Sequence, residues 1–262
     1  MNLADGRTDP SSGSNRPSSG DSDGTGDRLV VTIDGPAGTG KSSVARTVGS
    51  RLGLFVLDTG AMYRAVAWLA GRDAIDPADE KRLLAAMDEH PVVSQPDGDR
   101  TVVEVGGVDP GDSLRRPDVE SIVSIVAALP GVRDRLVDAQ RDFARRHPRL
   151  VTEGRDQGSV VFPDASARFF LTASPEVRAR RRAEQIVEKD GGSPDVGEIL
   201  RGIEVRDRLD ATRSEGPLIK PEGAIEIDTD SLDLEMVVER IVSIVRDSMP
   251  GGKSDHSEGT GC

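Results

Sequence analysis

The sequence predicts an α/β fold: three layers around a central parallel sheet, with an inserted α+β segment and a short lid. Short runs rich in β-branched residues alternate with amphipathic helical patterns, which is typical of a parallel sheet covered by helices. The run 29–33 is almost entirely apolar, as expected of a strand buried on both faces. A glycine-rich turn and a helical pattern follow it directly, so the chain passes from strand through loop to helix.

The helix after this turn is predicted because Val44, Val48 and Leu52 recur at helical spacing on one face. Gly53 offers the flexible residue that ends such a helix. Later apolar runs that precede helical patterns predict further strands at 55–57, 150–152, 169–172 and 224–227.

The alternation of strand and helix breaks between residues 73 and 116. A short helical pattern covers 80–89, and two β-rich runs flank the turn 96–99. An Asp-Gly turn between β-branched runs favours a hairpin. We therefore expect an inserted α+β subdomain over about 73–116.

Composition restricts the remaining possibilities. Residues 1–27 and 251–262 hold few bulky apolar side chains, which predicts disordered tails on either side of a single domain at 28–250. The net charge of -12 argues against nucleic-acid or anionic-membrane partners. No run is apolar enough for a membrane helix or a signal peptide, so we expect a cytoplasmic protein. We also expect a monomer. Cys262 is the only cysteine, which excludes a disulfide framework.

Residues 35–42, Gly-Pro-Ala-Gly-Thr-Gly-Lys-Ser, fit the G-x-x-x-x-G-K-[ST] pattern of a P-loop between the predicted strand and helix. Backbone amides of such a loop surround a polyphosphate, Lys41 reaches its β and γ phosphates, and Ser42 offers a hydroxyl to Mg²⁺. The predicted cofactors are ATP and Mg²⁺, and the residues predicted to bind them here are Gly35, Pro36, Ala37, Gly38, Thr39, Gly40, Lys41, Ser42 and Ser43. Kinases, GTPases and ATPases share this loop, so it specifies no reaction.

A second loop follows the predicted strand 55–57 and lies at the same edge of the sheet. Residues 57–64 read Leu-Asp-Thr-Gly-Ala-Met-Tyr-Arg and run into a helix. A second phosphate could bind there, next to Arg64. Asp58 has two interpretations, as a site residue or as the N-cap of the following helix.

At this point the chain resembles the bacterial cytidylate kinases, a family of nucleoside-monophosphate kinases. Residues 58–64 match their D-[ST]-G-x-x-Y-R motif, and 154–165 match G-R-D-x-G-[ST]-V-V-F-P-D-A. Residues 206–213 reproduce the fixed positions of R-D-x-x-D-x-x-R. The resemblance covers about 29–249. It departs where Thr59 replaces the serine of many members and Glu153 the aspartate of some, which leaves a role of Glu153 toward Mg²⁺ open.

The resemblance implies a substrate and a set of contacts. The substrates would be CMP and dCMP, phosphorylated to CDP and dCDP in pyrimidine metabolism. Arg64 and Arg155 would bind phosphate, Thr59 the nucleotide, and Arg213 the transferring phosphates. The residues implied to contact the cytosine base are Ser124, Arg133 and Asp156, and those implied to contact the ribose are Arg206 and Asp210.

The base contact of Asp156 has a physical reason, because cytosine offers an amino donor where uracil offers a carbonyl acceptor. Without the resemblance, Ser124 and Arg133 would be surface residues of a helix, and Arg206 with Asp210 an intrahelical ion pair.

Ser174 and Pro175 predict the start of a helix. The resemblance implies that this helix belongs to a lid over ATP, at about 174–192. Arg178, Arg181 and Arg182 share one of its faces, and we expect Arg181 to contact ATP.

The expected chemistry is in-line transfer. A phosphate oxygen is already ionised at neutral pH, so no general base is needed, and the cations only neutralise and hold two anions. The predicted catalytic residues are Lys41, Arg64, Arg155 and Arg213. Two alternatives stay open: a P-loop kinase for another small molecule, and a GTPase switch or nucleotide sensor. The chain has no N-K-x-D segment for reading guanine, which disfavours the GTPase.

Overall fold

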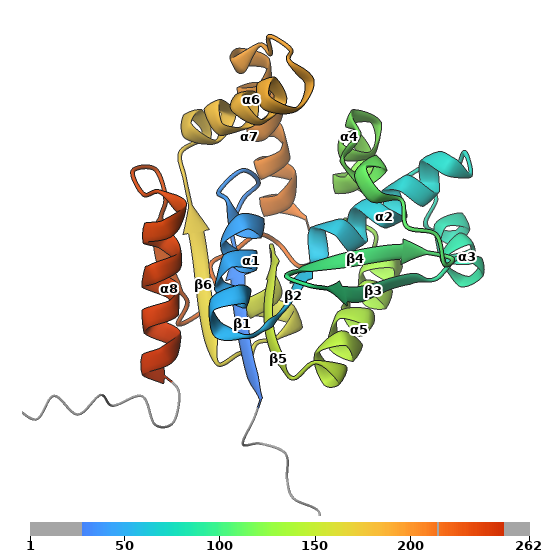
Figure 1. Ribbon diagram of the computed structural model, residues 1–262. Helices are drawn as coiled ribbons and strands as arrows, with labels where there is room; N and C mark the ends of the chain where they lie inside the picture. The colour runs from blue at the N-terminus through green and yellow to red at the C-terminus, as the bar shows by residue number, and fades with distance from the viewer. Residues whose placement is uncertain (1–27, 214, 249–262) are drawn as a thin grey trace, which may run out of the picture.

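The computed structural model describes residues 28–213 and 215–248, so both predicted tails lie outside the described residues. Five parallel strands form one sheet in the order β2-β5-β1-β6-β7 (Figure 1). The strands are β1 (Leu29–Asp34), β2 (Phe55–Asp58), β5 (Arg149–Gly154), β6 (Ala167–Thr172) and β7 (Ile225–Asp228). All the strands predicted from apolar runs are confirmed, with ends that differ by at most two residues.

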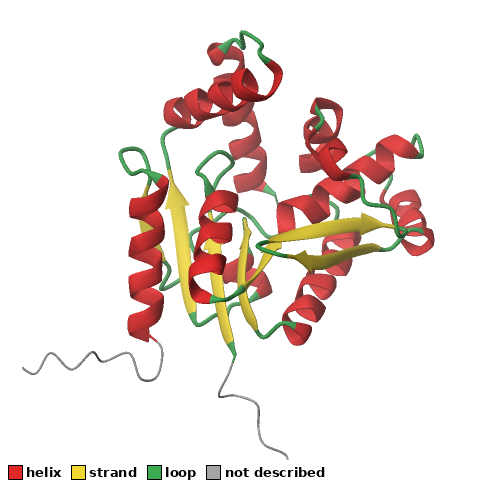
Figure 2. Cartoon of the chain, viewed as in Figure 1, coloured by secondary structure: helices red, strands yellow, loops and turns green. Residues whose placement is uncertain are grey.

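Helices cover both faces of this sheet and make the predicted three layers (Figure 2). Val31 and Ile33 of β1 pack with α1 (Lys41–Leu52) and α8 (Leu234–Ser248) in one apolar cluster. Val30 points the other way, into the cluster of α2 (Thr59–Arg72) and α5 (Pro130–Arg146). Side chains alternate along a strand, so Thr32 and Asp34 share the face of Val30.

The stretch 73–116 contains the helix and the hairpin that the sequence predicts. Helix α3 spans Glu80–Glu89, strand β3 spans Val92–Asp97, and β4 spans Arg100–Val105 with antiparallel pairing. The turn between the two strands covers residues 98–99 and is therefore shorter than the predicted 96–99. Gly98 adopts a φ of 61° in this turn. Leu83 and Val103 are buried in the same cluster as α2 and α5, so the stretch shares a core with the main fold. Its limits as a subdomain stay a prediction.

Two further helix pairs complete the fold near the carboxyl ends of the strands. A short 3₁₀ turn at Gly111–Arg115 leads into α4 (Pro117–Val126), and α6 (Pro175–Asp190) packs against α7 (Val196–Thr212) (Figure 1). Ser174 caps α6 by accepting a hydrogen bond from the Val177 amide. An ion pair of 2.5 Å between Arg182 of α6 and Glu120 of α4 links the two groups of helices. The lid limits stay a prediction.

None of the helices in the described ranges is both long and apolar enough to cross a bilayer.

Candidate functional site

The P-loop connects β1 to α1 at the carboxyl edge of the sheet, as the sequence predicts. Gly35 has φ of 148°, and a Cβ there would lie 2.2 Å from the Leu171 carbonyl oxygen, so only glycine fits. Gly40 has φ of 89° and directly precedes α1. Lys41 is buried, and its Nζ donates a hydrogen bond of 2.8 Å to the Pro36 carbonyl. The lysine thus lies folded against the loop that would hold the phosphates.

Three segments meet around Glu153, near the end of β5. Its carboxylate accepts a hydrogen bond of 2.7 Å from the Ser42 hydroxyl, and its carbonyl accepts one of 2.8 Å from Thr59 Oγ1. Burial raises the pKa of Glu153, and the neighbouring Asp58 raises it further. Glu153, whose role toward Mg²⁺ the sequence left open, therefore connects the P-loop to the acceptor-side loop.

Asp58 is the N-cap of α2, as one of its two interpretations held. Its carboxylate accepts a hydrogen bond of 2.8 Å from the Ala61 amide. The same carboxylate lies 3.3 Å from the Arg64 guanidinium. Arg64 Nε is buried and has no partner in the part of the chain that the structure describes. A phosphate oxygen would satisfy this donor.

A third group of predicted residues joins β5 to α7. Arg155 Nε donates a hydrogen bond of 2.8 Å to the Asp210 carboxylate, so Asp210 pairs across elements rather than along its own helix. Burial and the nearby Arg155 lower the pKa of Arg206, while burial and Arg133 lower the pKa of Arg213. Burial is the main cause of both shifts and a neighbouring guanidinium adds to each, so a bound polyanion would stabilise these two charges.

Two predicted base contacts form a buried pair. Arg133 Nη2 donates to an Asp156 carboxylate oxygen, and Arg133 Nη1 lies 3.3 Å from the Tyr63 hydroxyl. Arg133 and Asp156 are only 4% and 3% exposed. Gly216 lies directly against both side chains and leaves no room for a Cβ, and its carbonyl accepts a hydrogen bond from Arg213. In this conformation the pair is covered, so a base would reach it only if Gly216 moved.

Two other predicted contacts, Ser124 and Arg181, lie on helices α4 and α6, which do not carry this pair. Ser124 is half-buried on α4. The guanidinium of Arg181 donates hydrogen bonds to Thr229, the residue directly after β7, and its contact with ATP stays a prediction. Arg178 instead contacts the P-loop, because its guanidinium donates a hydrogen bond of 3.1 Å to the Ala37 carbonyl. The same guanidinium pairs with Asp207.

Several residues around the site had no role in the sequence argument. Asp34 accepts hydrogen bonds from two backbone amides after β5. Tyr63 and Gln157 contact the buried pair Arg133–Asp156. Both lie inside the family motifs at 58–64 and 154–165, but the sequence argument gave them no role. The one signal for Asp34 is its charge at the end of an otherwise apolar strand, directly before the P-loop.

The donor set fits a metal ion that is held mainly by phosphate oxygens. Within 28–213 and 215–248, no group of three or more His, Cys, Asp or Glu could hold a metal by itself. The Ser42 hydroxyl next to the Glu153 carboxylate provides hard oxygen ligands of the kind that Mg²⁺ uses together with nucleotide phosphates.

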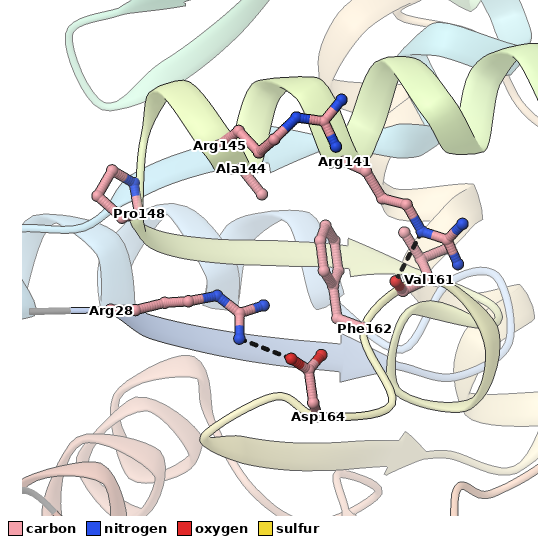
Figure 3. Close-up of a pocket in the computed structure, with 8 residues that line it drawn as sticks. All are labelled: Arg28, Arg141, Ala144, Arg145, Pro148, Val161, Phe162 and Asp164. Atoms are coloured by element: carbon pink, nitrogen blue, oxygen red, sulfur yellow. Dashed lines mark hydrogen bonds and ion pairs between the residues drawn. The ribbon is translucent and has the colours of Figure 1, made fainter. Parts of the chain in front are cut away.

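A separate cavity of about 350 Å³ opens at the opposite, amino edge of the sheet (Figure 3). Arg28 pairs there with Asp164 at 2.7 Å, and Phe162 forms part of the wall. None of the predicted site residues lines this cavity.

Comparisons with known proteins agree with the geometry. The family model described as cytidylate kinase matches residues 31–247. The cytidylate kinase of Nocardia farcinica is 42% identical over 226 residues, which cover 86% of this chain and 97% of that protein. The cytidylate kinase of Corynebacterium efficiens is 43% identical over 220 residues, covering 84% and 95%.

A third relative is longer than this chain. The bifunctional pantoate ligase/cytidylate kinase of Synechococcus sp. (strain WH7803) is 44% identical over 219 residues, which cover 83% of this chain and 44% of that protein. The family model spans most of the chain, and two relatives match over nearly their whole lengths. The resemblance inferred from the motifs is thus confirmed, and the chain belongs to the cytidylate kinase family.

Proposed function

We propose that this protein transfers the γ-phosphoryl group of Mg-ATP to CMP and dCMP, forming CDP and dCDP in pyrimidine nucleotide metabolism. The observation that carries the proposal is that one edge of the sheet holds the P-loop, a crowd of guanidinium groups, and the Arg133–Asp156 pair. Family membership supports the same reaction. We also propose that the enzyme is cytoplasmic and monomeric, and that it has no nucleic-acid or membrane partners.

The donor side of the site is the P-loop. Its backbone amides and the N-terminus of α1 provide partial positive charge for the ATP phosphates. Lys41 is poised to exchange the Pro36 carbonyl for phosphate oxygens. When bound, Mg²⁺ would supply charge neutralisation, and Ser42 with Glu153 are the residues positioned to hold it. Arg178 is positioned to fix the loop through the Ala37 carbonyl.

The acceptor side lies between the end of β5 and the start of α2. Arg64 and Arg155 would bind the CMP phosphate, because each offers a planar fork that matches phosphate oxygens. In the structure each pairs with a carboxylate, Asp58 and Asp210 respectively, which limits the side chain to few orientations before substrate binds. Arg213 would act on the transferring group.

The transfer needs no general base from the protein. The attacking CMP phosphate oxygen is already ionised at neutral pH, and it forms a bond to the γ phosphorus as the bond to the ADP oxygen breaks. The protein contributes position and charge, because two polyanions repel unless cations lie between them. Lys41, Arg64, Arg155 and Arg213 provide those cations.

The choice of base rests on Asp156. Its carboxylate accepts hydrogen bonds only, so it favours the amino group of cytosine over the carbonyl of uracil. Arg133 would donate to the ring acceptors of cytosine. These two side chains bond each other beneath Gly216, so cytosine would place its edge against an aligned pair once Gly216 moves.

A substrate panel tests the proposal. The protein is incubated with Mg-ATP and, separately, CMP, dCMP, UMP, AMP or GMP, and ADP production is followed. We expect CMP and dCMP to give the highest kcat/KM, and Asp156→Ala to reduce the preference for CMP over UMP more than it alters KM for ATP. Equal rates with CMP and UMP in the unmodified protein would overturn the assignment of the base.

A further inference from the structure

Asp34 carries a fully buried carboxylate that has no role in the proposed reaction. It lies next to the chain that follows Asp156, a member of the buried pair Arg133–Asp156. It is the last residue of β1 and 0% exposed. Its two oxygens accept hydrogen bonds of 2.8 Å from the Gln157 amide and 2.7 Å from the Gly158 amide. These two amides directly follow Asp156 in the chain. A single carboxylate thus fixes the backbone on which Asp156 stands.

The side chain of Gln157 continues this network. Its Oε1 accepts a hydrogen bond of 2.9 Å from Thr152 Oγ1, and its Nε2 donates one of 3.1 Å to Gln140 Oε1. The same Nε2 lies 3.5 Å from Asp156 Oδ1, at the long limit of a hydrogen bond. Gln157, Gln140 and Thr152 are each 1% exposed or less. An amide with this many buried partners has little freedom to rotate.

The two oxygens of Asp156 therefore face different partners. Arg133 bonds Oδ2, and the Gln157 amide faces Oδ1. The turn below is held close to β1, because a Cβ at Gly158 would lie 2.8 Å from Thr32 Oγ1. With the backbone and both oxygens constrained, the carboxylate plane has one preferred direction.

We infer that Asp34 and Gln157 are positioning residues that set the direction of the Asp156 carboxylate and thereby the preference of the enzyme for cytosine over uracil. Asp34 fixes the main chain directly after Asp156, and the Gln157 amide group faces the Asp156 carboxylate. Neither touches the base. The inference rests on the proposed function, because it concerns how the base contact of that reaction is oriented.

The direction of this carboxylate matters because cytosine and uracil differ at one hydrogen-bonding group that Asp156 would read. A hydrogen bond weakens steeply as its angle departs from linearity. A carboxylate that turns freely would lose much of its contact with the amino group, and it would also repel the uracil carbonyl less. Selectivity falls in both cases while phosphate binding by the arginines is retained.

The decisive variant is Gln157→Met, which keeps the side-chain length and the backbone amide that Asp34 holds but removes the amide donor. It is made in the unmodified protein and in Asp156→Ala, and the ratio of kcat/KM for CMP to that for UMP is measured in each. We expect Gln157→Met alone to lower this ratio about fivefold to tenfold, a coupling of the size usual for contacting residues. In the Asp156→Ala background it should change the ratio less than twofold.

Asp34→Asn provides the second measurement. Its amide group can accept from one of the two backbone amides but opposes the other, so we expect the same loss of selectivity, again absent without Asp156. The matched control is Gln95→Met on the exposed face of β3, which should leave the ratio unchanged. If Asp34→Asn fails to fold, Gln157→Met decides alone.

Two results would overturn the inference. One is an unchanged CMP-to-UMP ratio in Gln157→Met. The other is an equal loss of selectivity with and without Asp156, which would indicate a general structural role. Both differ from failure of the proposed function, in which the unmodified protein itself would show no preference for CMP.

Discussion

The hydroxyl of Ser42, at the start of α1, donates a hydrogen bond of 2.7 Å to the carboxylate of Glu153, near the end of β5. This contact joins the donor side of the site to the strand that leads to the acceptor side. It also gives Glu153, a buried acid whose pKa is raised by burial, a specific partner.

We expect Glu153→Gln to weaken the use of Mg²⁺. The amide keeps the shape and one oxygen acceptor but loses the charge that supports a cation next to Ser42. Residues that support metal ligands usually change affinity about tenfold to hundredfold, so half-saturation with Mg²⁺ should rise by at least tenfold. The measurement is activity against Mg²⁺ concentration at saturating ATP and CMP. The control is Glu89→Gln on α3, and an unchanged half-saturation in Glu153→Gln would contradict the prediction.

Lys41→Met should separate activity from stability. Removing the lysine that reaches the transferring phosphates should reduce kcat at least about hundredfold. Burial, and then the nearby Arg155, lower the pKa of Lys41 to about 7 in the folded protein. The charged lysine is thus unfavourable in the fold without substrates, so the variant should have a higher free energy of unfolding at pH 7.

The sign of the pH dependence follows from proton binding. Between pH 7 and 10.5 the unfolded chain holds more protons on Lys41 than the fold does, so its contribution to stability improves as pH rises. The stability gained by Lys41→Met should therefore shrink between pH 7 and pH 9. Chemical denaturation at both values measures it, with the exposed Lys81→Met as control. A gain that stays constant with pH would count against the buried charge.

Asp210→Asn should destabilise the fold and impair transfer. Asp210 is 5% exposed; burial opposes its ionisation, but Arg155 holds the pKa of Asp210 below its usual range. Removing the charge leaves Arg155 without its partner, at a cost of about 2 kcal/mol in unfolding free energy. This contribution is present above the unfolded pKa and is lost as pH falls through the lowered folded pKa.

Urea denaturation at pH 7 and pH 3 measures the difference between Asp210→Asn and the unmodified protein, which should be larger at pH 7. The matched control is Asp142→Asn, which breaks the exposed pair with Arg145 and should cost less than about 1 kcal/mol. Equal losses for the two variants would show that burial does not strengthen the Asp210 contact.

Two residues of α8 provide a test of the core. Ile241 is fully buried against the sheet, whereas Met236 on the same helix is 52% exposed. Ile241→Ala should lower the free energy of unfolding by about 2–5 kcal/mol because it leaves a cavity. Met236→Ala should stay within about 0.5 kcal/mol. Denaturant titration measures both, and a large loss in Met236→Ala would indicate a contact that the structure does not show.

The P-loop illustrates why part of this site could be predicted from the sequence. Its glycines and Lys41 are adjacent in the chain, so spacing alone specified the loop between β1 and α1. The hairpin of β3 and β4 could be predicted for the same reason, because the residues of its Asp-Gly turn are adjacent in the chain. Arg181 shows where such reasoning stops: three arginines share one face of α6, and only the packed structure places Arg178, rather than Arg181, against the loop.

The sequence by itself determined the strands and the phosphate loop, because each depends on neighbours within one turn or one strand. Only the tertiary structure decided which charges meet: Ser42 with Glu153, Arg155 with Asp210, Arg133 with Asp156, and Asp34 with the amides after Asp156. These partners are separated by 23 to 124 positions in the chain. Parallel strands bring them to one edge, and burial then requires each charge to find a partner there.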